Sequence, residues 1–231
     1  ISSIGDLKRK TIALLDQVFP EYASSFSNIF GKTSKEILSN FSTPSDFEDI
    51  NSDDLNTFLE SVTRKNYASK KIDELSKKAS SSFGINFCLD SFSLQIKMLI
   101  EQISFIQNQV SDVENEIEVL LEKLNSPITT IPGIGSVNAA TILGEIGDIK
   151  RFSNPSKLVA YAGLDASVSQ SGEYESTYNH MSKRGSPYLR RALFQSALRA
   201  EFCDPVFSDY YQKKISEGKH HLVATNAVAR K

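Results

Sequence analysis

The sequence has little of the chemistry that marks a metal site, a disulfide framework or a membrane segment. Its 231 residues include only two cysteines, Cys88 and Cys203, 115 positions apart and without CxxC or His-rich spacing near either. This argues against a zinc site and against disulfides, so both thiols are predicted to be reduced packing residues and no metal site is expected. No apolar run reaches about 18 residues, so no membrane span is expected.

A secretory signal is also lacking, because no basic n-region and apolar h-region follow Ile1. We therefore expect a cytoplasmic protein. Apolar residues make up 40% and charged residues 23% of the sequence, which is typical of a globular protein and excludes disorder throughout. The missing initial Met and the abrupt basic end at Arg230 and Lys231 suggest a piece of a longer protein.

The net charge of −2 conceals a division along the chain. Residues 1–127 hold 13 Lys and Arg against 19 Asp and Glu, a net charge of −6. Residues 180–231 hold 10 against 4, a net charge of +6. The basic end is therefore the candidate for binding a polyanion, with a merely solvated basic surface as the alternative.

Apolar periodicity predicts a mostly α-helical fold in three parts: 1–90, 91–126 and 127–231. The first part is a cluster of helices, beginning with residues 6–19 and continuing through short helices whose predicted N-caps are Ser34, Ser45 and Ser52. Residues 64–82 are rich in Lys and Ser and are predicted to be an exposed helix or a mobile connection.

Residues 91–126 carry the strongest periodic signal, because apolar residues fill two seams through four heptads. One seam is Ile96, Ile103, Val110, Ile117 and Leu124, and the other is Leu99, Ile106, Val113 and Leu120. This pattern predicts a coiled coil. Its partner is either another copy of the chain, which makes a homo-oligomer, or an earlier helix of the same chain folded back. Pro127 ends the coil and begins the third part.

A Pro-Gly-Ile-Gly run at 132–135 has the pattern of a helix-hairpin-helix loop followed by an apolar helix. Gly133 and Gly135 allow a tight turn, and the helix that starts near Ser136 adds a partial positive charge. Such a loop grips a phosphate without reading bases. The alternative is a tight turn between packed helices that binds no ligand.

A basic helix follows at 188–202, with Ser186 as its predicted cap and Pro187 in its first turn. Four cations gather at its start and predict sequence-independent contact with phosphates: Lys183, Arg184, Arg190 and Arg191. The polar stretch 165–179 before it is predicted to be a small hairpin or extended loop. It is rich in serine, but serine is common in loops, so the pattern alone predicts no nucleophile.

Taken together, these motifs resemble the IS-one-ten family of insertion-sequence transposases over residues 128–231. The matching segments are Ile131-Pro132-Gly133-Ile134-Gly135, Leu143-Gly144-Glu145-Ile146-Gly147-Asp148, Leu158-Val159-Ala160-Tyr161-Ala162-Gly163-Leu164, Ser171-Gly172, Ser182-Lys183-Arg184-Gly185-Ser186 and Leu189-Arg190-Arg191-Ala192-Leu193. Across residues 1–127 the resemblance is weaker, although the predicted coiled coil lies where the family has one.

The resemblance implies a DNA recombinase that excises and inserts its element through a serine in this domain. Ser171 matches the family's Ser-Gly position, and Ser169 is the second candidate. The family pairs this serine with an acidic, magnesium-binding RuvC-like domain that precedes it. A structured guide RNA directs the family to its DNA, so the implied partners are DNA, both element ends and target, and RNA.

The sequence departs from the family pattern in one respect, because residues 1–127 contain no DEDD-like set of acidic strands. The acids on the coil, Glu114, Glu116, Glu118 and Glu122, fit its solvated face. We therefore predict that this fragment lacks the RuvC-like domain, needs no cofactor of its own, binds nucleic acid and does not cleave it. The alternative is a non-catalytic helix-hairpin-helix binding or scaffold protein.

Overall fold

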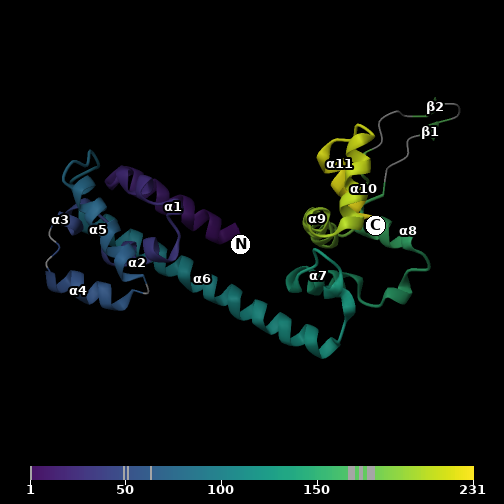
Figure 1. The fold of residues 1–231 in the computed structure, drawn as a ribbon, viewed down its shortest axis with the longest axis horizontal. Coiled ribbons are helices and arrows are strands. Elements are labelled where there is room, and N and C mark those ends of the chain that lie inside the picture. Colours follow the sequence, from purple (N-terminus) through teal and green to yellow (C-terminus); the bar gives the residue numbers. More distant parts are fainter. Residues whose placement is uncertain are drawn as a thin grey trace. The chain divides into compact units, whose positions relative to one another are not determined.

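The computed structural model describes residues 2–48, 50, 52–62, 64–165, 170–171, 174–175 and 180–231. The chain divides into two compact units, residues 1–111 (unit 1) and 112–231 (unit 2), with the boundary inside one long helix. Both units are built almost entirely of helices (Figure 1), which confirms the predicted mostly α fold. No helix in the described part of the chain is long and apolar enough to cross a membrane.

Unit 1 is a bundle of short helices packed against the first half of that long helix. Its elements are α1 (Ser2–Val18), η1 (Pro20–Ser25), α2 (Lys32–Asn40), α3 (Pro44–Glu48), α4 (Ser52–Ser61), α5 (Lys65–Ala79) and α6 (Leu89–Leu124), which crosses into unit 2. The core of unit 1 draws on α1 to α6 and includes Phe19, Tyr22, Ile72 and Ile96. Residues 65–79 form a helix, as one of the two alternatives for that segment predicted, but the helix is not an exposed one, because Ala68, Ile72, Leu75 and Ala79 are buried in the core.

Two of the predicted caps in unit 1 are wrong. Gly31 is the N-cap of α2, and Ser34 lies inside that helix, where its Oγ is 2.9 Å from the buried Tyr22 hydroxyl. Ser45 lies inside α3, which begins at Pro44. Tertiary packing explains the first error, because the hydroxyl of Ser34 has a buried partner in η1 and so is not needed as a cap.

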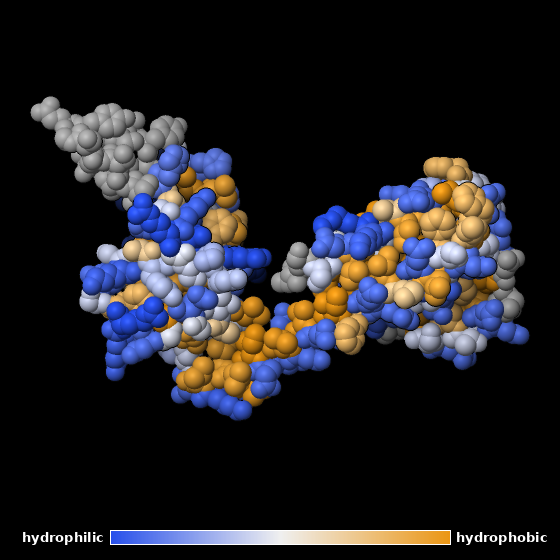
Figure 2. All heavy atoms as spheres, turned by 180° about the vertical axis from the view of Figure 1, so that it is seen from behind, coloured by the Kyte–Doolittle hydropathy of each residue, from blue (hydrophilic) through white to orange (hydrophobic). Residues whose placement is uncertain are grey.

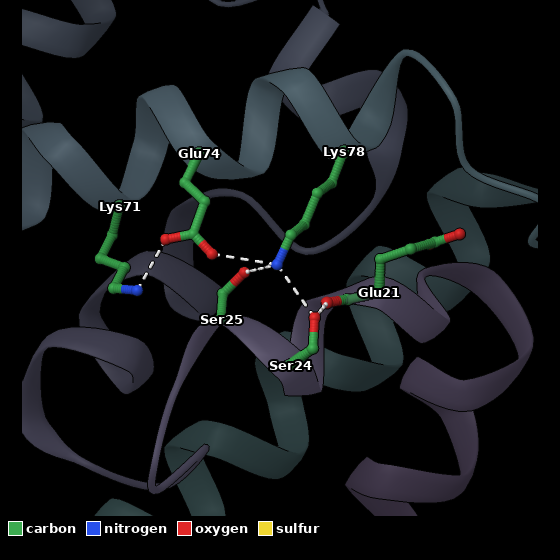
Figure 3. A network of polar contacts seen from close by, with 6 residues as sticks. All are labelled: Glu21, Ser24, Ser25, Lys71, Glu74 and Lys78. Carbon is green, nitrogen blue, oxygen red and sulfur yellow. Dashed lines mark hydrogen bonds and ion pairs between the residues drawn. The ribbon is translucent and has the colours of Figure 1, made fainter.

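A polar network ties η1 to α5 (Figure 3). The Glu74 carboxylate accepts from Lys71 Nζ at 2.7 Å and from Lys78 Nζ at 3.0 Å, and Lys78 Nζ also donates to the hydroxyls of Ser24 and Ser25. Hydrogen bonds from the two lysines lower the pKa of Glu74 to about 2. Burial raises the pKa of Tyr22 far above its usual range. The hydrogen bonds of Ser24 and Ser25 with Lys78 and of Tyr22 with Ser34 join η1 to α5 and α2, in addition to its apolar contacts.

The seam residues of α6 have two different environments. Ile96 and Ile103 are buried within unit 1, so this half of the seam is covered by the chain's own helices. Further along, Val113, Leu120 and Leu124 are exposed at 60%, 49% and 65%. Figure 2 shows hydrophobic side chains exposed along this helix. The coiled coil with a second copy stays a prediction, and it now concerns only the exposed half.

Unit 2 contains the end of α6 and a helical domain. Its further elements are η2 (Pro127–Thr130), α7 (Ser136–Ile146), η3 (Ile149–Arg151), α8 (Pro155–Ala162), β1 (Gln170–Ser171), β2 (Tyr174–Glu175), α9 (Pro187–Cys203), α10 (Pro205–Ser216) and α11 (His221–Ala229). α9 is central and packs against α7, α8, α10 and α11. One core cluster of the unit joins Ile142 of α7, Ala162 of α8 and Leu189 of α9.

Side-chain caps set the helix starts of unit 2. Asn154, Ser186 and Asp204 accept hydrogen bonds from backbone N–H groups in the first turns of α8, α9 and α10. Gly163 ends α8 in the left-handed conformation, with φ of 66°. The cap at Ser186 and Pro187 in the first turn of α9 confirm the sequence predictions.

Candidate nucleic-acid interface

Ser171 lies in a small antiparallel sheet. β1 and β2 pair antiparallel, with Ser171 opposite Tyr174. Asp165 and Ser182 lie on either side of these strands in the chain, and we call this pair the hairpin base: the Ser182 N–H donates to Asp165 O at 2.9 Å, and the Ser182 hydroxyl donates to the Asp165 carboxylate. The side chain of Ser171 and the whole of Ser169 lie outside the described part of the chain, so the two candidate nucleophiles stay predictions.

A groove lies beside the hairpin base, between α9 and α11. It consists of two adjoining cavities of 290 and 260 Å³ that share Met181, Leu222 and Asn226. The first is also lined by Asp165, Lys183 and Arg230, and the second by Arg190, Arg191 and Phe194. We call this the α9–α11 groove. Its walls carry four cations and one carboxylate, so it attracts an anion.

Three of the four predicted cations therefore meet at one place: Lys183, Arg190 and Arg191. Arg190 is half-buried, and its Nη1 donates to Ala162 O at 3.1 Å, the carbonyl at the end of α8. A guanidinium has five N–H donors, so this contact orients Arg190 without using up its capacity to bind a phosphate. Arg184 is exposed but does not line the groove.

The segment 182–186 is held against α8 by close backbone packing. A Cβ on Gly185 would lie 1.8 Å from Tyr161 O, so this position accepts no side chain. Ser186 Oγ donates to Glu145 Oε2 at 2.6 Å while it accepts from Leu189 N–H at 3.1 Å. Lys183 has a positive φ of 53°, which a non-glycine residue rarely adopts. These contacts fix the backbone that presents Lys183 and the start of α9.

The Pro-Gly-Ile-Gly turn is not part of this groove. Gly133 has φ of 89°, and a Cβ there would lie 2.4 Å from Ser196 O and 2.8 Å from Ala200 N in α9. Ser196 lies six residues after Arg190, which is about 9 Å along the helix. Gly133 thus allows close packing of the turn on the middle of α9.

The other two residues of the predicted phosphate loop lie beyond this contact. Gly135 is the N-cap of α7 and is exposed, with no atom within 4 Å of a Cβ built on it. Ser136 Oγ donates to Glu118 Oε1 of α6 at 3.2 Å, and that carboxylate repels a phosphate at the same place. The geometry of Gly133 favours the alternative of a packing turn, while phosphate binding by Gly135 and Ser136 stays a prediction.

Sequence reasoning missed two groove residues, Asn226 and Arg230 of the C-terminal segment. Arg230 follows α11 directly, and α11 packs on α9 through buried Thr225, whose hydroxyl donates to Glu201 Oε2 at 3.0 Å. The basic end of the chain was a signal for Arg230, whereas nothing in the sequence distinguishes Asn226 from a surface residue. Within the described residues no group of three or more His, Cys, Asp or Glu side chains is arranged to hold a metal ion.

Comparison with known proteins finds a family for part of the chain. Residues 125–212 match the model of the family described as "Transposase IS116/IS110/IS902 family". This range includes the turn, the hairpin and the arginines of α9. The chain is also similar to a 43.6 kDa protein of insertion element IS110 from Streptomyces coelicolor, 30% identical over 142 residues, which are 61% of this chain and 35% of that protein.

Two further relatives carry names that state what they do. A pilin gene-inverting protein from Moraxella bovis is 28% identical over 150 residues, 62% of this chain and 47% of the relative. A transposase for insertion sequence element IS1328 from Yersinia enterocolitica is 31% identical over 141 residues, 57% of this chain and 42% of the relative. The chain thus spans between about a third and a half of the length of these relatives. Residues 125–212 of the chain are thus similar to the IS116/IS110/IS902 family of transposases.

Proposed function

We propose that the chain is the nucleic-acid-handling part of an insertion-sequence transposase whose nucleophile is Ser171. The observation that carries the proposal is the family match over 125–212, which includes Ser171 and three of the four cations of the α9–α11 groove. A sugar-phosphate backbone that lies in this groove passes Asp165 and Lys183, the groove residues on either side of the segment that carries Ser171. In this proposal that segment brings the serine to a scissile phosphate.

The proposed chemistry is a transesterification. The Ser171 hydroxyl loses its proton, Oγ bonds to phosphorus, and a DNA hydroxyl leaves with the electrons of the broken P–O bond and takes up a proton. Attack by a hydroxyl of a second DNA end then reverses these changes and releases the serine. Because the phosphoserine bond conserves the energy of the phosphodiester, strand exchange needs no nucleotide cofactor.

The remaining parts of the proposal concern groups outside this chain. A free serine hydroxyl is a weak nucleophile, so it needs a partner that activates it. We propose that a RuvC-like domain elsewhere in the protein holds Mg²⁺ for this purpose, and that this chain alone binds nucleic acid without cleaving it. A guide RNA is the proposed second partner, and two copies of the chain associate through the exposed seam of α6.

The decisive test uses the full-length protein with element-end DNA. Ser171→Ala should abolish the covalent protein–DNA product and strand exchange while leaving DNA affinity unchanged within about twofold. Ser169→Ala, in the same stretch, is the matched control and should retain activity. Retained recombination in Ser171→Ala together with its loss in Ser169→Ala would make Ser169 the nucleophile, and retained recombination in both variants would favour the non-catalytic binding or scaffold protein. A covalent phosphoserine product made by residues 1–231 alone would contradict the proposed inactivity of this chain.

A further inference from the structure

A second cavity with features of a nucleotide site lies in unit 1, far along the chain from Ser171. It has a volume of 510 Å³ and is lined by the start of α2 and by the residues on either side of the start of α5. Ligand pockets in proteins span about 300–1,000 Å³, so it is large enough for a small organic ligand. Sequence analysis predicted only a helical cluster here.

Two aromatic rings line the cavity, those of Phe26 and Tyr67. Tyr67 is 44% exposed, so much of its ring is open to contact. The ammonium group of Lys71 lies 5.5 Å from the centre of the Phe26 ring and 5.9 Å from that of Tyr67, and Glu74 holds it there (Figure 3). A cation covers one face of the Tyr67 ring and leaves the other face for a base to stack on. The Phe26 ring also packs against the buried Tyr22, with 5.1 Å between the ring centres, so Phe26 forms a wall of the cavity.

Cations also line the same cavity, in a part of the chain that is otherwise acidic. Lys32 and Arg64 belong to the lining, and Lys71 lies against its two rings. Residues 1–127 have a net charge of −6, so a long polyanion gains little from this unit as a whole. Lys71 is paired with Glu74, so Lys32 and Arg64 are the two cations of the lining that fit one phosphate. Glu36, also in the lining, is placed to accept from a sugar hydroxyl or a base amino group.

We propose that this cavity binds one nucleotide of a single-stranded nucleic acid, with its base against Tyr67 and its phosphate at Lys32 and Arg64. Stacking on aromatic rings together with cations along the backbone is the usual chemistry of single-strand binding. A duplex keeps its bases paired and offers no face to the rings. The proposal does not depend on Ser171 or on the α9–α11 groove.

The test is photo-crosslinking of the 231-residue chain to a decamer RNA that contains 4-thiouridine, with a 4-thiothymidine DNA decamer in parallel. Crosslinked peptides that contain Phe26 or Tyr67 are expected. Arg64→Ala combined with Tyr67→Ala should lower their yield about tenfold, since stacking on an aromatic ring contributes about 1–3 kcal/mol. Lys77→Ala combined with Phe83→Ala removes an exposed cation and an exposed ring outside the cavity and should change nothing.

Several outcomes would overturn the proposal. These are crosslinks confined to residues 112–231, an equal loss in the control variant, or competition by a polyglutamate peptide as strong as that by unlabelled RNA. Competition by uridine monophosphate or inorganic phosphate at the same phosphate concentration as RNA would assign the cavity to a free metabolite, which also contradicts it. The double variant Lys183→Ala/Arg191→Ala removes two cations of the α9–α11 groove. Crosslinks in the cavity that persist in this variant would show that the cavity binds nucleic acid independently of the groove.

Discussion

Two glycines of unit 2, Gly133 and Gly144, lie in different environments. Gly133 adopts a positive φ and touches the backbone of α9, whereas Gly144 lies on the exposed side of α7 with no atom within 4 Å of a Cβ built on it. The same residue type therefore has opposite consequences at the two positions. A positive φ together with a close backbone neighbour makes glycine obligatory.

Replacement of these glycines by alanine tests this difference. Gly133→Ala should reduce the free energy of unfolding by about 1–3 kcal/mol or more, because the new methyl group clashes with α9 and the φ becomes strained. Gly144→Ala should increase it by about 0.5–1 kcal/mol, because alanine is the better residue in a helix. Urea denaturation of both variants measures the changes. Similar small effects at both positions would contradict the packed geometry of the turn.

In unit 1 a charged network joins η1 to α5, and its contribution to stability depends on pH. The hydrogen bonds from Lys71 and Lys78 favour the ionised form of Glu74 and lower its pKa from 4.5 to about 2. A carboxyl group whose pKa falls on folding stabilises the folded state at pH values above its pKa in the unfolded chain. This stabilisation is lost as the pH falls toward the pKa that the group has in the folded chain. The link between η1 and α5 should therefore weaken in acid.

The substitution Glu74→Gln isolates this effect. Near neutral pH the variant should melt at a lower temperature than the wild type, because the lysines lose their anionic partner. The difference should narrow as pH falls below 4.5 and disappear near 2, where Glu74 itself is protonated. Asp73→Asn removes the same charge from an exposed neighbour on α5 and is the control. A melting-temperature difference that does not change with pH would contradict the assignment.

The second element with a testable property is α6. Val113 and Leu120 belong to the predicted seam but are exposed. A row of exposed apolar side chains on one helix face is expected where that face contacts a partner. Val113→Glu combined with Leu120→Glu should convert an oligomer into a monomer in sedimentation velocity. Ser111→Glu combined with Asn115→Glu adds the same charge outside the seam and should leave the mass unchanged. A wild-type chain that sediments as a monomer at all concentrations would refute the coiled coil.

At the scale of the whole molecule, charge is separated along the chain. In the acidic half Lys32 and Arg64 line a cavity, and in the basic half four of the ten cations of residues 180–231 line the α9–α11 groove. Binding through phosphate contacts releases counterions, so its dependence on salt reports how many contacts are made. This gives a measurement of the groove that does not require catalysis.

Affinity for duplex DNA should fall steeply with salt in the wild-type chain. Lys183→Ala and Arg191→Ala should each weaken binding similarly for all DNA sequences and reduce the slope of log affinity against log salt by about 1. Lys219→Ala, an exposed cation outside the groove, should leave the slope within experimental error of the wild type. Equal changes in all three variants would indicate a diffuse basic surface with no defined site.

The sequence by itself determined the helical fold, the cap of α9 and the identity of three groove cations. These features are local: a 3.6-residue period, a capping side chain before a helix and basic residues close together in one segment. It also carried the family resemblance, because short motifs in a fixed order do not depend on the structure.

Only the tertiary structure decided which residues meet. It showed that Gly133 packs on α9, that half of the α6 seam is covered by the chain's own helices, and that Asn226 and Arg230 join Lys183 and Arg190. It also brought Phe26, Lys32 and Tyr67 around one cavity. The physical reason is that these contacts link residues far apart in the chain, and the free energy that selects them comes from packing and burial, which no local pattern encodes.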